Sequence, residues 1–478
     1  MSKCSFGRII LNDIFDAKYP FGKDLEGRFI YIENESMRWL LGVFDFSGSF
    51  RRTCLAWRNA VSCATGIPAE NIWYHELQTH AAPISWELDG EPCRRLIDKT
   101  VPVIREMISK AEEAELCYII CDFEDKFTLN REQYIPELGT VTVWSGLKFD
   151  NAGLPYTQNP EFMLLDGYLP PIPAFKEPIY FDRPVDSQAV LMVFRAKSGK
   201  VLGSISRFAA HPDVAVLFES RGIYDQYHYS SDWPGYLRDT IQSAVGGISL
   251  YINGPCANLS VKKGYDGMDT YIKCEEEARR IGEEIALEFL RQWSSCRHTW
   301  QDISLKGGSH KNIKLPIRNS IALCLNNPLC HEEKIKEAGS RLALAIASGQ
   351  PPAAIKRLID EKKHLSAAET IIKEWAGLER DELENGLAEI ELEAVAINDL
   401  VLAGLPGECL TETCTWLRSQ SLGNKLIVLD QVNGYMGYMT TPESYDQGGY
   451  TYWGGWVARN AEPAMRKGCL GLIRKLTL

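Results

Sequence analysis

The pattern of apolar and polar positions along this chain changes repeatedly between the period of a strand and that of a helix. In one long segment Val101, Ile104 and Ile108 recur on one helical face. Other runs are rich in β-branched and aromatic residues, which is typical of strands. Strands are predicted at 28–32, 40–46, 71–77, 116–121, 189–195, 201–210, 247–252, 390–405 and 425–431. Helices are predicted at 51–66, 93–115, 234–245, 269–292 and 409–417.

This alternation predicts a single mixed α/β domain over 1–478, layered in the α/β/α manner. Ser198-Gly199 predicts the turn of a hairpin between the strands on either side of it. A Gly- and Pro-rich stretch at 126–173 predicts an excursion over the surface. The charged, strongly helical segment at 330–386 predicts a helical insertion. A lid, a subunit contact and a solvated helical layer are all open roles for it.

Composition narrows the function classes. The chain has 478 residues, 45% hydrophobic and 24% charged, which is ordinary globular usage. Its net charge of -11 argues against a nucleic-acid partner and against constitutive binding to anionic lipid surfaces. No apolar run predicts a membrane span or an export signal, and the 14 cysteines include no C-x-x-C pair. We therefore expect reduced cysteines and a cytoplasmic location; the oligomeric state is not predicted.

Two histidines follow predicted strands, where α/β folds place functional groups. His80 lies just past the strand at 71–77, and His211 ends a strand immediately before Pro212. The proline restricts the backbone of His211 to extended conformations, which would fix the imidazole at a rim as a metal ligand requires. For either histidine alone, a hydrogen-bonded structural role is the alternative.

Other polar residues near predicted strand ends have a structural or a functional interpretation. Ser231-Asp232 begins a helix or lines a site. Ser260 follows a buried strand, without the G-x-S-x-G pattern of a nucleophile elbow. Glu408, after Pro-Gly, is a metal ligand or a carboxylate at a helix N-terminus. Tyr438 and Tyr450 stand near glycines and present either exposed phenols or packed aromatic rings.

The order of these segments along the chain is more specific than any one of them. They read Q-T-H-A-A-P, Asn130-Arg131, A-A-H-P, S-S-D-W-P-G-Y, A-N-L-S, L-P-G-E and N-G-Y-M-G-Y-M-T-T-P-E-S-Y. Over about residues 25–460, this series resembles the neutral ceramidase family. The resemblance implies a zinc-dependent hydrolase of amide bonds. Family members often carry a C-terminal immunoglobulin-like domain, which we do not expect here.

The resemblance also implies roles for individual residues. His211, Glu408 and Tyr438 match zinc ligands of the family, and His80 matches the second histidine of T-H-T-H. Ser260 matches the serine proposed as the nucleophile. Arg131 and Tyr450 match polar groups that hold the substrate amide and its transition state.

Two positions depart from the family pattern. Gln78 stands where the family has a zinc-ligating histidine, and a neutral amide oxygen is a poor ligand for zinc. His80 or His75 could supply the missing nitrogen, Gln78 could bind a harder metal, or the metal could be lost. We predict that His80 fills the place. In the second departure, Val261 follows Ser260 where the family commonly has proline.

The expected activity is hydrolysis of the C–N bond of an N-acyl amine to a carboxylic acid and an amine. Metal-activated water or Ser260 would attack the carbonyl, and Arg131 and Tyr450 would stabilise the oxyanion. Since no export signal is evident, we expect a small-molecule amide or lactam that is smaller or more soluble than ceramide, and a lipid-like amide is the alternative. The alternatives are a metal-free binding protein and a metal-free serine hydrolase that uses Ser260 with His211 or His80.

Overall fold

The computed structural model describes most of the chain, and all structural statements below concern its described residues. These are 2–16, 19–84, 87–135, 138–142, 147–149, 155–157, 179–218, 224–225, 228–262, 271–375 and 385–477. Much of the predicted excursion at 126–173 lies outside them.

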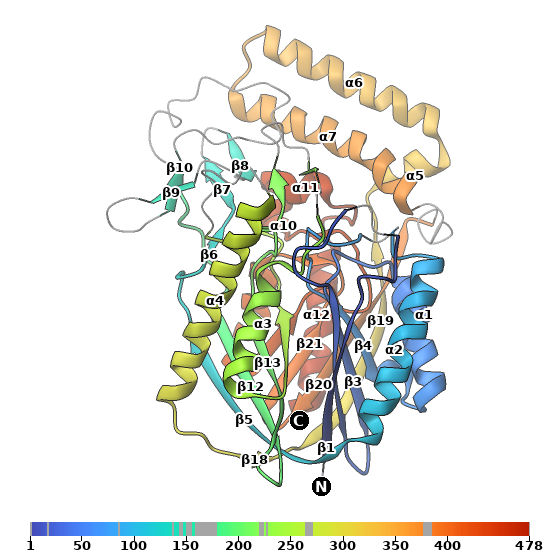
Figure 1. Ribbon diagram of the computed structural model, residues 1–478. Helices are drawn as coiled ribbons and strands as arrows, with labels where there is room; N and C mark the ends of the chain where they lie inside the picture. Colours follow the sequence, from blue (N-terminus) through green and yellow to red (C-terminus); the bar gives the residue numbers. More distant parts are fainter. Residues whose placement is uncertain are drawn as a thin grey trace.

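The larger of two main sheets has nine strands and holds most of the first half of the chain (Figure 1). Its main path runs in the order β16-β13-β12-β5-β1-β2-β3-β4, and the short β18(Gln301–Asp302) pairs with β5. The bounds are β1(Lys3–Ile10), β2(Glu26–Glu33), β3(Arg38–Phe44), β4(Ile72–Glu76), β5(Glu112–Asp122), β12(Gln188–Ala196), β13(Val201–Phe208) and β16(Ile248–Asn253). The predicted hairpin is confirmed, because β12 and β13 pair antiparallel and Gly199 takes the positive φ that the turn requires.

The second sheet has four strands in the order β19-β20-β21-β23. They are β19(Leu305–Pro316), β20(Leu387–Ile397), β21(Leu400–Gly404) and β23(Leu426–Leu429). The single strand predicted at 390–405 is therefore wrong: it is a hairpin, and Asn398 turns the chain at a φ of +56°. Successive side chains of a strand point to opposite faces of the sheet. Leu400 and Leu402 enter the core that the two sheets share, whereas Val401 enters a separate core on the other face.

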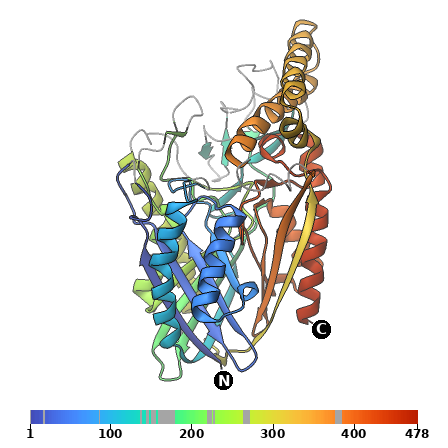
Figure 2. The same ribbon diagram turned by 90° about the vertical axis from the view of Figure 1, so that its right-hand side faces the viewer.

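Helices cover the outer faces of both sheets. Helices α1(Arg51–Thr65) and α2(Glu91–Ser109) share a core with β2–β4, while α3(Asp232–Val245) and α4(Tyr271–Ser295) contact the part of the sheet that holds β12 and β13. Helix α12(Ala461–Thr477) lies on the outer side of the second sheet (Figure 2), joined there by α9(Thr411–Ser419). The predicted mixed α/β class is confirmed, with two packed sheets between helices. Among the described residues, no helix has both the length and the apolar composition needed to cross a bilayer.

The end of the helix predicted at 93–115 was placed too far along the chain. The helix expected at 93–115 ends at Ser109, and β5 begins at Glu112. Residues 114–122 pair antiparallel with 188–196 over nine positions. This long ladder outweighs the helical propensity of the alanines and glutamates that begin β5.

The helical insertion stands beyond the strand ends at one end of the molecule (Figure 1). It consists of α5(Asn319–Asn326), α6(Pro328–Ala347) and α7(Pro352–Trp375), so its helices begin earlier than the predicted 330. Helix α6 packs against α7, and α7 contacts the short helix α11(Tyr450–Gly454) of the main body.

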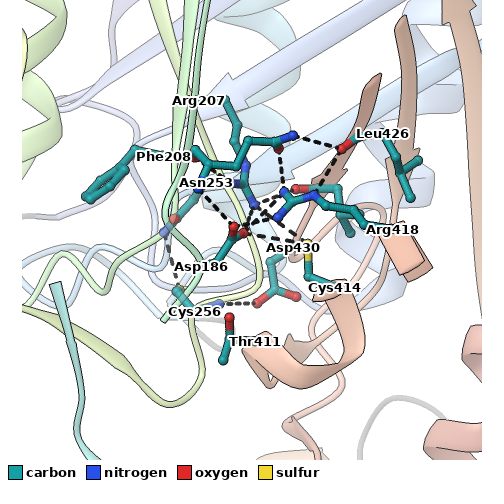
Figure 3. A network of polar contacts seen from close by, with 12 residues as sticks. Asp186, Arg207, Phe208, Asn253, Cys256, Thr411, Cys414, Arg418, Leu426 and Asp430 are labelled. Carbon is teal, nitrogen blue, oxygen red and sulfur yellow. Dashed lines mark hydrogen bonds and ion pairs between the residues drawn. The ribbon is translucent and has the colours of Figure 1, made fainter. Parts of the chain in front are cut away.

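A buried ionic cluster joins the large sheet to the second sheet (Figure 3). Asp186 accepts hydrogen bonds of 2.5 Å from Arg207 on β13 and from Arg418 on α9. Arg418 also donates to the Leu426 carbonyl of β23 at 3.2 Å. Burial raises the pKa of Asp186, but the two guanidinium charges outweigh burial and hold that pKa below its usual range.

Replacing Asp186 with asparagine tests this cluster. Two buried arginine charges would lose their partner, so the free energy of unfolding should fall by about 3–5 kcal/mol. Urea unfolding followed by circular dichroism measures it. The control is Asp446→Asn, because the Asp446–Arg459 pair is about half exposed and should contribute little. Equal losses in the two variants would contradict the role given to the buried cluster.

Candidate functional site

The strands that lead into the two predicted histidine loops finish at the same end of the large sheet. Strand β4 lies parallel to β3, and β16 lies parallel to β13. At the end of β16, the side-chain amide of Asn253 donates to the Leu77 and Ala210 carbonyls, both at 3.0 Å. One side chain therefore fastens the segments that lead to His80 and His211.

His75 belongs to this support. Its Nε2 accepts the Asn253 backbone N–H at 3.0 Å, so that lone pair is already used. Burial lowers the pKa of His75 to about 4, so the ring is neutral near pH 7. His75 is therefore a structural acceptor, and this contact argues against its supplying the missing nitrogen through Nε2.

His80 and His211 are brought together. The His80 backbone N–H donates to the Pro212 carbonyl at 2.9 Å, and the ring centroids lie 5.3 Å apart. Burial first, and then the neighbouring His211 imidazole and Arg131 guanidinium, lower the pKa of His80 to about 3. A neutral imidazole is the form that binds a metal.

The ring of His211 is oriented by its second nitrogen. Nδ1 lies 2.7 Å from the Cys256 carbonyl oxygen, to which it can only donate, so Nε2 keeps its lone pair for the site. Trp233 Nε1 donates to the His211 carbonyl at 3.1 Å. Asp232 accepts from the backbone N–H groups of Val214 and Ala215 at 2.9 and 2.7 Å. The predicted helix start is confirmed, because Asp232 begins α3, and its carboxylate also holds the loop after His211; that this segment lines the site stays a prediction.

Glu408 and Tyr438 come from two short strands that pair parallel, β22(Glu408–Cys409) and β24(Tyr438–Met439). The Tyr435 hydroxyl donates to Glu408 Oε1 at 2.8 Å, while Oε2 lies 3.4 Å from His211 Nε2. Burial raises the pKa of Glu408, but the contacts with His211 and Tyr435 outweigh it and lower that pKa overall. The carboxylate is therefore ionised near neutral pH.

Asp430 connects the two loops that carry these donors (Figure 3). It follows β23 and accepts backbone N–H groups of Cys409 at 3.1 Å and Cys256 at 3.4 Å. Cys409 is the neighbour of Glu408, and the Cys256 carbonyl orients His211. Sequence reasoning missed this residue, although its place at the end of an apolar strand was a usable signal.

The remaining predicted residues surround the same point. Arg131 Nη2 lies 3.3 Å from His211 Nε2, and the ring of Tyr450 lies 5.1 Å from that of Tyr438. Ser260 forms a backbone bridge with His211; among the described residues, no hydrogen bond joins its hydroxyl to an imidazole. All seven predicted residues thus lie in one region, and their roles stay predictions.

Two of the predicted donors, His211 and Glu408, lie at a spacing that fits a metal, with one conflict. Two ligand atoms about 2.1 Å from a tetrahedral zinc ion lie about 3.4 Å apart, which is the separation of His211 Nε2 and Glu408 Oε2. Glu408 Oε2 is buried and makes no hydrogen bond within the described part of the chain. However, Arg131 lies against the same His211 nitrogen, and metal binding would require its guanidinium to withdraw.

Gln78 does not offer its oxygen to this set. Its Oε1 accepts a hydrogen bond from Gln431 Nε2, and both residues have a positive φ. This pairing argues against Gln78 as a ligand, and the role of His80 as the source of a further nitrogen stays a prediction.

A second cluster also has metal-ligand chemistry. His310, Glu391 and Glu393 lie close enough to share an ion. Arg58 already contacts both carboxylates, and Arg51 pairs with Glu391 at 3.3 Å. Arg51 also pairs with Glu389 at 3.0 Å. These arginine–carboxylate pairs make a salt-bridge network the simpler account of this cluster.

Comparison with known proteins supplies the fold. No protein-family model matches the chain, and no curated protein sequence matches it. The crystal structure of neutral ceramidase from Pseudomonas aeruginosa is similar, with a TM-score of 0.62 and 14% identity over 99% of this chain and 74% of that one. A ceramidase complexed with C2 gives a TM-score of 0.63 and 14% identity over 100% and 75%. The chain has a neutral ceramidase-like fold. The resemblance drawn from the ordered motifs is thereby confirmed at the level of the fold.

In this ceramidase-like fold, buried neutral His75 makes stability depend on pH. The unfolded chain takes up a proton below pH 6.5, whereas folded His75 does so only near 4, so stability is lost as pH falls through this window. Between pH 7.5 and 5.5 we expect His75 to account for a loss of about 1 kcal/mol in the free energy of unfolding. His75→Gln keeps an acceptor but does not titrate, so urea titrations should show a smaller loss for it. An identical pH dependence would contradict the role of His75.

Proposed function

We propose that this protein is a metal-dependent amidohydrolase that cleaves the C–N bond of an N-acyl amine. One observation carries the proposal: on a ceramidase-like fold, His211 Nε2 and Glu408 Oε2 lie 3.4 Å apart, beside Arg131 and Tyr450. His80 and Tyr438 would complete the set that holds zinc. Bound zinc would polarise the amide carbonyl and lower the pKa of a water molecule.

The residues of the chain would supply the rest of the chemistry. Burial, and next the charge of Glu408, raise the pKa of Tyr450, so its hydroxyl keeps its proton and can donate to a developing oxyanion. Arg131 carries a permanent charge, and the Ala257 carbonyl, which accepts from its Nη2 at 2.6 Å, helps hold it in place. Ser260 or water would attack the carbonyl.

The substrate class follows from the similar structures, two ceramidases, and from the donor set. A secondary amide with an acyl chain fits both. We propose a small amide, more soluble than ceramide, for the cytoplasmic setting expected from the sequence. Hydrolysis rates for short-chain N-acyl amines and long-chain ceramide in mixed micelles test the choice; a strong preference for ceramide would reverse it.

Metal dependence is tested by removing zinc and its ligands. Chelation should abolish hydrolysis and added zinc should restore it. His211→Ala and Glu408→Ala should lose bound zinc, measured by elemental analysis. Each should also lower kcat/KM more than about 100-fold, which exceeds the loss expected when a residue that only supports a metal ligand is removed. His310→Ala is the matched control, because it removes a histidine from the other His/Glu cluster and should change neither quantity.

Chelator-resistant hydrolysis that Ser260→Ala abolishes would instead identify a metal-free serine hydrolase. Two observations support a metal-free protein: Arg131 contacts His211, and Gln78 pairs with Gln431. A protein without bound metal and without hydrolysis after zinc addition would be a binding protein on this fold.

Gln78→His tests the departure from the family pattern. An imidazole at this buried position would offer a further nitrogen ligand, so zinc affinity should rise at least about tenfold, or about 1.4 kcal/mol. Competition with a chromophoric chelator measures the affinity, and Gln78→Asn, which keeps an amide, is the control. Unchanged affinity in Gln78→His would place residue 78 outside the coordination sphere.

A further inference from the structure

Tyr450, the tyrosine proposed to stabilise the oxyanion, begins a helix that is too short to be stable by itself. Helix α11 spans five residues and begins with Tyr450, directly after Gly448 and Gly449. Both glycines have a positive φ, so the chain enters the helix through a turn that L-residues rarely adopt. A single helical turn is unstable in isolation, so the place of Tyr450 depends on what holds the two ends of α11.

The helical insertion holds the first end. The Gly449 N–H donates to Asp360 Oδ2 of α7 at 3.1 Å. A Cβ on Gly448 would come within 2.4 Å of the same oxygen, so the turn and the carboxylate fit closely. Lys356 pairs with Asp360 at 2.6 Å, and both side chains are only 4% exposed. This buried pair gives Asp360 a fixed position from which to accept the Gly449 N–H.

The same insertion holds the last turn of α11. His364 of α7 approaches the Trp453 carbonyl at 3.2 Å through Nδ1, and its Nε2 lies 2.5 Å from the Ser320 hydroxyl of α5. Burial lowers the pKa of His364 to about 3, so a neutral ring donates through Nδ1 and accepts through Nε2. Arg318, just before α5, donates to the Tyr452 carbonyl at 2.5 Å.

Where α7 meets the Gly448–Gly449 turn, close apolar packing of the described residues does not hold the turn in addition to these hydrogen bonds. A cavity of about 330 Å³ lies beside this contact between α7 and the turn, and Asp360 and Gly448 both line it. The main body contributes its contacts further along α11: Thr451 donates to buried Glu132 at 2.6 Å, the Thr440 hydroxyl donates to the Thr451 carbonyl at 2.8 Å, and the Tyr450 ring packs against that of Tyr438. Without Asp360, the turn before Tyr450 would therefore have room to shift.

We propose that the helical insertion is a positioning element of the site, in which Asp360 acts as a positioning residue for Tyr450. The insertion would raise the rate by holding the Tyr450 hydroxyl where the oxyanion forms, without touching the substrate itself. This inference rests on the proposed function, because Tyr450 needs a fixed position only if it serves the reaction.

Two double variants separate positioning from loss of stability. In Lys356→Met with Asp360→Leu, apolar side chains replace the buried ion pair and no acceptor faces Gly449. In Lys356→Met with Asp360→Asn, the charge pair is also lost but an amide oxygen can still accept the Gly449 N–H. Replacing both members of a buried pair is often neutral for stability. Glu361→Gln, on the next residue of α7 and paired with Arg341 of α6, is the control.

We expect the Leu variant to lower kcat about tenfold with KM changed less than twofold, while bound zinc and the thermal midpoint stay the same. The Asn variant and Glu361→Gln should keep kcat within about twofold of the wild type. Equal kcat values in the two double variants would overturn the proposal. A rise in KM that matches the fall in kcat/KM would also overturn it.

Amide hydrogen exchange of the segment 449–454 gives a readout independent of turnover. Exchange should accelerate in the Leu variant and stay slow in the Asn variant; unchanged exchange in the Leu variant overturns the proposal. If the wild-type protein hydrolyses no amide, the proposed function fails, and exchange alone then decides whether Asp360 holds the turn before Tyr450.

Discussion

The arrangement of the site depends on one buried carboxylate, that of Asp430. It accepts N–H groups from two loops, those of Cys256 and Cys409, which the Ala257 N–H also joins by donating to the Cys409 carbonyl at 3.1 Å. The first loop orients the His211 ring, and the second carries Glu408. Because both contacts are buried, water does not compete for them, and the two donor atoms from different sheets are held at the spacing of ligands around one ion.

Around that point, burial sets the protonation of each group differently according to its charge. It keeps His80 neutral and Tyr450 protonated, because the charged form of each is poorly solvated there. Glu408 stays ionised because His211 and Tyr435 contact its two oxygens. One region thus contains a neutral nitrogen donor, an anionic oxygen donor and a hydroxyl donor, the combination that metal-assisted acyl transfer uses.

The two-sheet architecture explains how such distant segments meet. Strand ends of the large sheet carry the histidine loops, and the chain that leaves β21 of the second sheet brings Glu408 into the short β22–β24 pair. The Asp186 cluster ties the sheets together beneath the site, and the helical insertion fixes α11 above it. Each tie is a buried polar contact with a defined direction, which fixes geometry more narrowly than apolar packing does.

The sequence by itself determined the α/β class, most helices, the β12–β13 hairpin and the seven residues that converge, because apolar periods and ordered motifs are local signals. It did not determine β1, β19 or α12, the turn at Asn398, or the start of β5, since each is stabilised by partners far along the chain. Only the tertiary structure decided that Gln78 pairs with Gln431, that His75 serves as an acceptor, and that Asp430 joins two loops. Hydrogen bonds between residues hundreds of positions apart leave no periodic trace in a sequence.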